Sequence, residues 1–497
     1  MKERLRFAPS PTGPLHIGGL RTALFNFLFA RKDKGSFILR IEDTDKNRIV
    51  EGSEKYIKEA LSWAGIDVDE GPFTGGNYGP YRQSERKSIY EEKIMILLKS
   101  KKAYYAFDSN ENLEELRKIE EKNGKKFKYD YSNRLKLDNS LNLNERQIFE
   151  RIKNEPYVIR LKVDPGETSI NDVLRGNIIV KNKILDDKIL IKADGYPTYH
   201  FANVVDDHLM EISTVIRGEE WLPSLAIHKL IYDAYGWETP KFIHLPLILK
   251  PQGKGKLSKR DSKEGGFPVF PLKWKEKLGY KELGFTNSGL INYLSLLGWN
   301  PGTEEEIFSL EELIDRFRIE GVQKGGAKFD YNKMKWINQK HISKISLDTF
   351  ISFFPKKLND LKKIFPKDYI KILRHIQKRI SLISEFDKEL NPFIQTPLKY
   401  DVVALNKLAK KNDLIDILSE IKKIIERESI NNLKENLYKV SEQKGIKFSI
   451  MMQSLRMSFI GNLSGPDLFF IAEIIKDSLS LKRVNKLINY LKKINTL

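Results

Sequence analysis

Cysteine is absent from this chain of 497 residues, and its absence excludes several kinds of chemistry. Without a thiol there is no disulfide, no thiolate zinc ligand and no cysteine nucleophile. A bound metal would have to use oxygen or imidazole ligands. Hydrophobic residues make up 40% of the chain, which is enough to build cores for the roughly three to five domains that this length predicts.

Long apolar runs are lacking too. No run approaches the roughly 18 residues that a membrane-spanning helix needs, and the first eight residues contain no apolar stretch of signal-peptide length. The mean hydropathy is −0.44 and charged residues make up 31% of the chain. We therefore expect a soluble globular protein of the cytoplasm, with no membrane partner.

Positive charge is plentiful and unevenly distributed. The net charge is +19, and residues 331–497 alone contain 32 Lys+Arg against 17 Asp+Glu. A region this basic is typical of a surface that binds a polyanion such as nucleic acid. A lysine-rich composition spread over solvated faces would give the same count, so charge alone does not decide between the two.

The first part of the chain alternates strand-like and helix-like patterns, with strands expected over 5–8 and 37–41 and helices over 19–31 and 53–64. This order favours a parallel, doubly wound sheet. We expect an α/β protein whose Rossmann-like parallel-sheet domain is split by an inserted α+β module and followed by helical domains. The predicted ranges are 1–100 and 193–250 for the two halves of the sheet domain, 101–192 for the inserted module, 251–330 for a loop and a further domain, and 331–497 for an all-helical domain.

The segment from Arg6 to Gly19 joins the first predicted strand to the first predicted helix. Its prolines restrict the backbone, and its glycines let a ligand approach closely. A helix that begins at Gly18-Gly19 would direct unpaired N–H groups at an anionic phosphate, and His16 could donate to a phosphoryl oxygen. The spacing matches neither the dinucleotide-binding fingerprint nor the P-loop. Taken alone, the segment could also be a stiff connector with one locally packed histidine.

A second motif, Lys256-Leu-Ser-Lys-Arg260, stands in a glycine-rich loop after a strand expected over 244–249. Lysines on such a loop can neutralise charge that develops during phosphoryl or nucleotidyl transfer. The pattern P-S-P-T-G-x-x-H-x-G followed by K-L-S-K-R resembles the two signatures of class I aminoacyl-tRNA synthetases, in the form found in bacterial-type glutamyl-tRNA synthetases. Residues 41–45, 194–208 and 215–222 resemble the same family.

The resemblance implies a set of site residues. A glutamate pocket needs an anion for the α-ammonium, which Glu42 can supply, and a cation for the γ-carboxylate, which Arg217 can supply. Contacts with glutamate or glutamyl-adenylate are implied for Arg6, Ala8, Ser10, Glu42, Tyr199, Asn203 and Arg217. The implied ATP-binding residues are His16, Gly18, Gly19, Glu220, Trp221, Leu222, Lys256, Leu257, Ser258 and Lys259, among which His16, Lys256 and Lys259 would be catalytic.

The resemblance also bears on metals. It implies ATP as a substrate, with Mg²⁺ on its phosphates. Relatives often carry a zinc knuckle in the inserted module, but here Ala106, Asp108 and Asn133 stand where cysteines would be expected, so we predict no zinc. We interpret His200 and His208, with Asp206 and Asp207, as an ordinary helix end rather than a metal site. The segment 261–280 is longer than the corresponding segment of relatives, and the sequence does not predict its structure.

The implied activity is that of a glutamate–tRNA ligase, which activates L-glutamate with ATP and transfers it to the terminal adenosine of tRNA(Glu). Whether tRNA(Gln) is also charged stays open. The inserted module would hold the acceptor end and the helical region the anticodon arm of the tRNA, and a monomer is expected.

Three alternatives remain to be distinguished. A glutaminyl-tRNA synthetase is disfavoured because residues 9–13 lack its Pro-Glu-Pro-Asn-Gly type of loop. A truncated tRNA-modifying paralogue would lack residues 331–497. A non-catalytic RNA-binding protein would not need two nucleotide motifs.

Overall fold

The computed structural model describes residues 2–253, 255–258, 261, 267–409, 413–430 and 432–495. The chain forms two compact units, one made of Met1–Glu282 with Leu290–Met334 and the other of Leu283–Gly289 with Lys335–Leu497. The finer domain ranges given above stay a prediction. Within the described ranges, no helix is both long enough and apolar enough to cross a bilayer.

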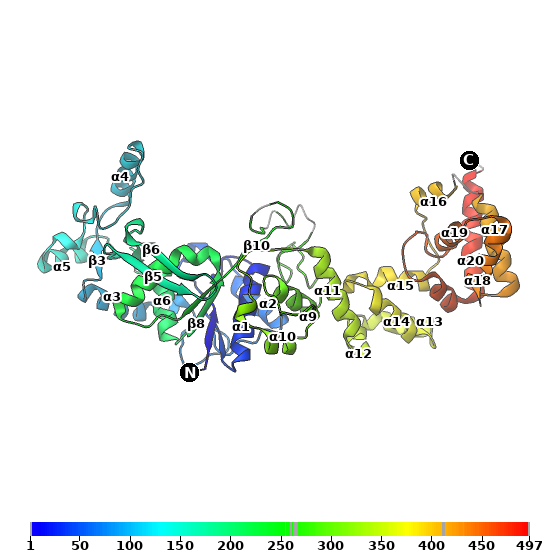
Figure 1. The fold of residues 1–497 in the computed structure, drawn as a ribbon, viewed down its shortest axis with the longest axis horizontal. Coiled ribbons are helices and arrows are strands. Elements are labelled where there is room, and N and C mark those ends of the chain that lie inside the picture. Colours follow the sequence, from blue (N-terminus) through cyan, green and yellow to red (C-terminus); the bar gives the residue numbers. More distant parts are fainter. Residues whose placement is uncertain are drawn as a thin grey trace. The chain divides into compact units, whose positions relative to one another are not determined.

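The first unit is built on a six-stranded sheet in the order β2-β1-β8-β9-β5-β6 (Figure 1). All neighbouring strands are parallel except the β5–β6 hairpin. The central strands are buried on both faces, which is typical of a parallel sheet covered by helices. This architecture confirms the predicted α/β class. The strands are β1 (Arg4–Phe7), β2 (Ser36–Leu39), β5 (Glu167–Asp172), β6 (Gly176–Lys181), β8 (Thr214–Gly218) and β9 (Lys241–Leu245).

Helix α1 begins two residues earlier than predicted, at Ile17, because the His16 side chain caps it. Its apolar residues at helical spacing are buried, as expected for a helix that packs on a sheet; they are Leu20, Ala23, Leu24, Phe27 and Leu28. The helices of this part of the unit are α1 (Ile17–Lys32), α2 (Ser53–Trp63), α3 (Lys87–Lys99), α6 (Tyr199–Leu209) and α7 (Leu225–Tyr235).

The prediction of a single strand over 244–249 is wrong, because the structure contains two strands in this region. Strand β9 ends at Leu245, and the short β10 (Ile248–Leu249) pairs with β11 (Ala327–Lys328) instead. Pro246 lies between them, and proline lacks the N–H that a continuous strand would donate to its neighbour.

Residues 101–192 divide between two sheets. Strands β3 (Ala103–Ala106), β4 (Val158–Leu161) and β7 (Ile189–Ile191) form a separate antiparallel sheet with α4 (Asn110–Lys122) and α5 (Glu145–Asn154) nearby. Strands β5 and β6 instead extend the main sheet, where β5 pairs with β9. The segment predicted as an inserted module therefore contributes two strands to the sheet that carries the site.

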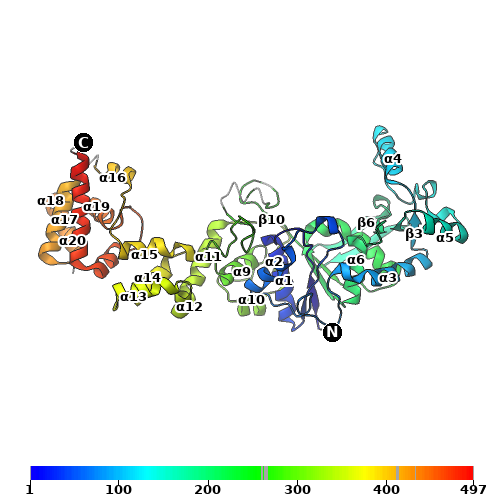
Figure 2. The same cartoon turned by 180° about the vertical axis from the view of Figure 1, so that it is seen from behind.

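The rest of the chain is mainly helical. Helices α17, α18, α19 and α20 lie side by side around a shared apolar core (Figure 2). The stripe Leu414 to Ile425 on α17 is buried, as its spacing predicts. Helix α20 contains a break at Lys476, whose backbone is not helical. The helices are α9 (Asn287–Leu296), α10 (Leu310–Arg316), α11 (Tyr331–Lys344), α12 (Leu347–Ser352), α13 (Pro355–Ile364), α14 (Tyr369–Arg379), α15 (Phe386–Ile394), α16 (Val402–Ala409), α17 (Leu414–Glu428), α18 (Leu433–Lys444), α19 (Phe448–Ile460) and α20 (Leu468–Asn495).

Candidate active site

Two adjoining cavities open near the carboxyl ends of β1 and β8, where ligands bind in open parallel sheets. One has a volume of about 500 Å³ and the other of about 270 Å³. They share part of their walls, so a molecule in one would touch a molecule in the other. The shared residues are Gly18, Gly19, Thr22, Gly218 and Glu220.

The smaller cavity is lined by every residue that the sequence predicts to contact glutamate. These residues come from β1, the segments that follow β1 and β2, helix α6 and the end of β8, so they are distant in sequence. They are Arg6, Ala8, Ser10, Glu42, Tyr199, Asn203 and Arg217.

Arg217 supplies positive charge to this cavity and is only 5% exposed. Its Nη1 donates to Tyr199 Oη at 2.9 Å and its Nε donates to His244 Nε2 at 3.0 Å. The buried Nη2 has no hydrogen-bond partner in the described part of the chain. A buried guanidinium that lacks a carboxylate partner is costly, and an anionic ligand would relieve that cost.

Glu42 supplies negative charge to the same cavity. Its Oε1 accepts hydrogen bonds from Asn203 at 3.1 Å and from Arg40 at 3.3 Å. Burial raises the pKa of Glu42 above its usual value, although Arg40 and Asn203 act in the opposite direction. Among the described residues no group donates to Oε2, so this oxygen is available to an ammonium group of a ligand.

Arg6 differs from Arg217 because its charge is compensated within the protein. Its Nε and Nη2 donate to the two oxygens of Asp207, at 2.9 and 3.1 Å. Arg40 donates to the same carboxylate at 2.7 Å. Arg6 therefore shapes the wall of the cavity but has less charge to offer an anion.

The polar side chains at the end of α6, Asp206, Asp207 and His208, contact other side chains of the protein. Asp206 accepts from Arg86 at 2.7 Å and Asp207 accepts from two arginines. The ring of His208 stacks on Trp237 at 3.7 Å. In the described part of the chain, no group of three or more His, Asp or Glu side chains could hold a metal ion.

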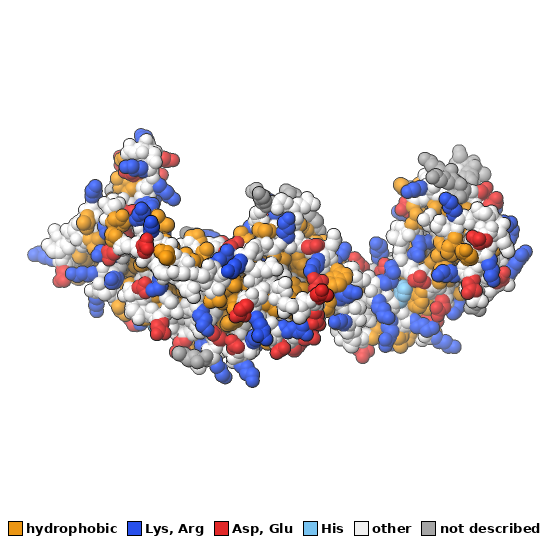
Figure 3. All heavy atoms as spheres, viewed as in Figure 1, with side chains coloured by type: hydrophobic (Ala, Val, Ile, Leu, Met, Phe, Trp, Pro, Cys, Tyr) orange, Lys and Arg blue, Asp and Glu red, His pale blue; other side chains and the backbone are white. Residues whose placement is uncertain are grey.

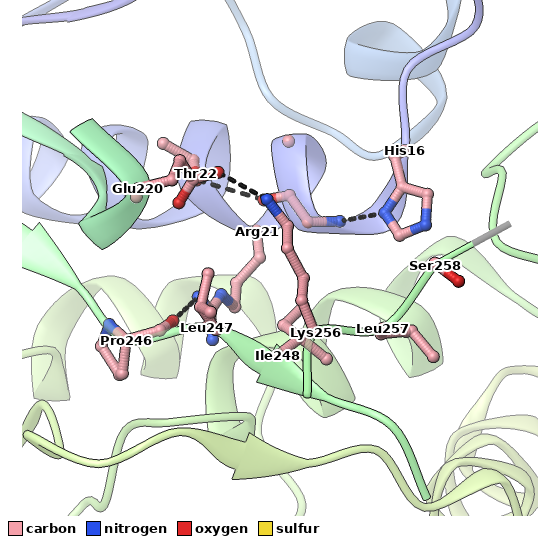
Figure 4. A pocket seen from close by; sticks show the side chains of 13 residues that line it. His16, Arg21, Thr22, Glu220, Pro246, Leu247, Ile248, Lys256, Leu257 and Ser258 are labelled. Atoms are coloured by element: carbon pink, nitrogen blue, oxygen red, sulfur yellow. Dashed lines mark hydrogen bonds and ion pairs between the residues drawn. The ribbon is translucent and has the colours of Figure 1, made fainter. Parts of the chain in front are cut away.

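The larger cavity is lined by most of the residues predicted to bind ATP (Figure 4). Trp221 lines the smaller cavity instead, and Leu222 lines neither but packs on the hydrophobic core. Lys259 lies outside the described residues. The predicted residues in the wall are His16, Gly18, Gly19, Glu220, Lys256, Leu257 and Ser258.

His16 is held by the helix that it precedes. Its Nδ1 accepts the N–H of Gly18 at 3.1 Å, so in the neutral ring Nε2 carries the proton. The N–H of Ile17 donates to Val269 O at 2.9 Å, which places the segment after the lysine loop against the start of α1. The N–H groups of Ile17 and Gly18 thus have partners in the protein, and the prediction of unpaired N–H groups at Gly18-Gly19 is wrong for Gly18.

Lys256 and Glu220 form an ion pair at the larger cavity, with Nζ 2.8 Å from Oε1 (Figure 4). Burial acts to raise the pKa of Glu220, but the hydrogen bond and charge of Lys256 lower it overall. Glu220 therefore holds the ammonium group of Lys256 at the wall of this cavity.

Sequence reasoning missed Arg21, which also lines the larger cavity. Its guanidinium donates to the carbonyl groups of Pro246 and Leu297, and burial lowers its pKa to about 10. The sequence did offer a signal for this residue, because Arg21 is a basic residue in the first turns of a helix predicted to face a phosphate. The linker between β9 and β10 was missed as well, and it adds Pro246, Leu247 and Ile248 to the wall.

Comparison with known proteins gives consistent results. Residues 2–336 match the catalytic domain of class I tRNA synthetases (E and Q), and residues 347–488 match an anticodon-binding domain.

Relatives and solved structures agree with these matches. The glutamate–tRNA ligase of Christiangramia forsetii is 50% identical, over 99% of both chains. That of Flavobacterium psychrophilum is 48% identical, over 98% of both. The crystal structure of a glutamate tRNA ligase from Elizabethkingia meningosepticum in complex with its amino acid has a TM-score of 0.86 at 42% identity, covering 98% of this chain and 99% of that one. Because the similarity extends over almost the full length of each chain, this chain belongs to the glutamate–tRNA ligases of the class I tRNA synthetase family.

Proposed function

We propose that this chain joins L-glutamate to the terminal adenosine of tRNA(Glu), using ATP. The observation that carries the proposal is that one small cavity contains both an uncompensated cation, Arg217, and an available carboxylate oxygen on Glu42. Glutamate carries a side-chain carboxylate that can pair with Arg217 and an α-ammonium group that can pair with Glu42. The adjoining larger cavity has room for ATP.

In the smaller cavity we assign the γ-carboxylate to Arg217 and the α-ammonium to Glu42. A guanidinium presents parallel N–H groups that match the two oxygens of a carboxylate. Tyr199 holds Nη1 of Arg217 and Asn203 holds Oε1 of Glu42, so both charged groups are oriented before a ligand arrives.

The first step needs no nucleophile from the protein. An oxygen of the glutamate α-carboxylate attacks the α-phosphorus of ATP, the bond from that phosphorus to the bridging oxygen breaks, and pyrophosphate leaves. In the second step a ribose hydroxyl of the terminal adenosine attacks the carbonyl carbon and AMP leaves. We assign to His16, Lys256 and Lys259 the stabilisation of charge at phosphorus, and to the cavity walls the positioning of the reactants.

We propose that Mg²⁺ enters on the phosphates of ATP and neutralises part of their charge. In this assignment the ion is held mainly by the nucleotide. We also propose that the protein acts as a cytoplasmic monomer.

The second unit, called here the helical unit (Leu283–Gly289 with Lys335–Leu497), is the proposed binding site of the anticodon arm. Its visible face carries lysine and arginine mixed with acidic side chains (Figure 3). A cavity of about 290 Å³ lies beside α15 and the end of α19, and its wall combines apolar, amide and hydroxyl side chains with Lys388, Lys399 and Glu389, the last of which is paired with Arg379. Such groups suit an unstacked RNA base and its phosphates. The polar side chains are Asn391, Gln395, Thr396, Asn462 and Ser464.

Exchange of pyrophosphate into ATP tests the proposed function. With glutamate present, exchange should be measured with and without tRNA, and glutamine should replace glutamate in a parallel assay. We expect exchange that depends on glutamate. Exchange driven equally by glutamine would favour the glutaminyl alternative, and none under any condition would favour a binding protein.

A further inference from the structure

Three buried polar side chains connect the glutamate cavity to the neighbouring strands of the sheet. Arg217 on β8 lies opposite His244 on β9, and Asp172 ends β5 on the far side of β9. The Nε of Arg217 donates to His244 Nε2 at 3.0 Å, and His244 Nδ1 lies 2.7 Å from Asp172 Oδ2. Asp172 and His244 have no exposed surface, so these contacts are shielded from water.

The donors and acceptors fix which nitrogen of His244 carries a proton. Asp172 can only accept, so Nδ1 of His244 must donate to it and Nε2 keeps the lone pair that receives Arg217. Burial lowers the pKa of His244, and the charge of Arg217 acts in the same direction, although the hydrogen bond to Asp172 opposes both. The imidazole is therefore neutral at physiological pH.

The other groups around Arg217 are uncharged as well. Tyr199 Oη accepts from Nη1, and His228 Nδ1 lies 3.3 Å from the same nitrogen. Burial, followed by the charge of Arg217, lowers the pKa of His228 well below its usual value. Among the described residues, the groups that hydrogen-bond to this guanidinium are therefore all neutral, whereas Arg6 is paired directly with the carboxylate of Asp207.

We propose that Asp172 and His244 are positioning residues that hold Arg217 through a neutral imidazole, so that its charge is reserved for the side-chain carboxylate of the substrate. This inference rests on the proposed function. A carboxylate in direct contact with Arg217 would neutralise the guanidinium. With the imidazole between them, Asp172 orients the arginine and its charge stays available for the ligand.

The arrangement also explains rejection of an uncharged substrate. The amide of glutamine would leave the buried cation uncompensated, and its NH₂ group would meet further donors on the guanidinium. Selection for glutamate over glutamine therefore depends on Arg217 and on the groups that keep it in place.

Two substitutions at His244 separate positioning from simple packing. His244→Gln can place an amide oxygen near the position of Nε2 and still accept from Arg217. His244→Asn keeps a polar group only near the position of Nδ1. In tRNA charging by the full-length protein, we expect His244→Asn to raise the KM for glutamate at least about tenfold, while the KM for ATP stays within about twofold. His244→Gln should restore the KM for glutamate to within about threefold of wild type.

Asp172→Asn is a second test of the same idea. The amide would favour a proton on Nε2 of His244, which then opposes the N–H of Arg217. It should raise the KM for glutamate as His244→Asn does, with thermal unfolding recorded for every variant as a control for folding.

Equal KM values for glutamate in the two His244 variants, or parallel rises in the KM for ATP, would overturn the positioning role. A wild-type protein that charges no tRNA with glutamate would instead refute the proposed function itself, so the two failures are distinguishable.

Discussion

At the scale of single residues, the two charged groups assigned to the ends of glutamate in the small cavity, Arg217 and Glu42, differ in how the protein compensates them. Arg217 lacks a carboxylate partner among the described residues, whereas Glu42 shares one oxygen with Arg40 and Asn203. The cation is therefore the group that most requires a ligand. The carboxylate is the group whose charge depends most on pH, because burial raises its pKa.

Replacing Arg217 by glutamine should impair the use of glutamate severely. The γ-carboxylate would enter a buried site without its opposite charge, which costs about 3–5 kcal/mol, on the order of 10²- to 10⁴-fold in kcat/KM. Charging of tRNA at varied glutamate concentrations measures the effect. Arg82→Gln, at a partly exposed arginine paired with Glu54, is the matched control and should change little. Activity close to wild type in Arg217→Gln would require another cationic partner, with Arg6 the next candidate.

The pH dependence of glutamate binding should follow Glu42. A carboxyl group with a raised pKa takes up its proton at a higher pH than usual, so the anion for the α-ammonium is lost earlier as the pH falls. We expect the KM for glutamate to rise on the acidic side, beginning above the usual range for glutamate side chains.

Asn203→Ala checks this assignment. The hydrogen bond from Asn203 lowers the pKa of Glu42, so its loss should move the acidic rise in KM to higher pH. A pH profile of unchanged position would show that another group controls binding.

At the scale of helices and strands, the sequence predicted the features that depend on local periodicity, such as which face of a helix is buried. The stripes of α1 and α17 are buried as their spacing indicates. The pairing of β5 with β9 was not predictable in this way, because it joins segments far apart in the chain and leaves no local pattern. His244 and Asp172 were missed for the same reason, although Arg217 itself was predicted.

Hydrogen bonds hold the loops around Asp108 and Asn139, in the segment predicted as an inserted module. Tyr129 Oη donates to Asp108 at 2.8 Å and accepts from Asn139 at 3.2 Å. Asp108 also accepts the N–H of Asp138 at 3.1 Å. These contacts bring together the segments around Asp108, Tyr129 and Asn139.

Tyr129→Phe should therefore destabilise the protein by about 0.5–1.5 kcal/mol, because it removes the two hydrogen bonds of a hydroxyl on a buried side chain. Thermal unfolding measures the effect, and Tyr131→Phe, at an exposed tyrosine, is the control. Elemental analysis should find no stoichiometric zinc, and a chelator should leave the unfolding temperature unchanged. Bound zinc, or a lower unfolding temperature with chelator, would contradict this account of the module.

At the scale of the whole molecule, we propose that recognition of tRNA involves both units, while the chemistry takes place in the two cavities of the first unit. The helical unit carries most of the net positive charge, since residues 331–497 contain 32 Lys+Arg and 17 Asp+Glu. Charge of this kind contributes to RNA affinity by releasing counterions, which makes binding sensitive to salt.

A double substitution, Lys388→Gln with Lys399→Gln, should weaken tRNA binding and flatten its dependence on salt. If each lysine neutralises one phosphate, the slope of log K against log salt should fall by about 1.4, at roughly 0.7 per contact for single-stranded RNA. Lys55→Gln, at an exposed lysine of α2, is the control. An unchanged slope in the double variant would remove this cavity from the anticodon interface.

The most direct test of the central claim is the charging of tRNA(Glu) by the wild-type protein with glutamate and with glutamine. The account predicts ATP-dependent charging with glutamate and a kcat/KM for glutamine lower by about 10³-fold or more, because only an anionic side chain compensates Arg217. The same assay with tRNA(Gln) shows whether the anticodon is also discriminated. Comparable charging with glutamine, or no charging with glutamate, would contradict the account.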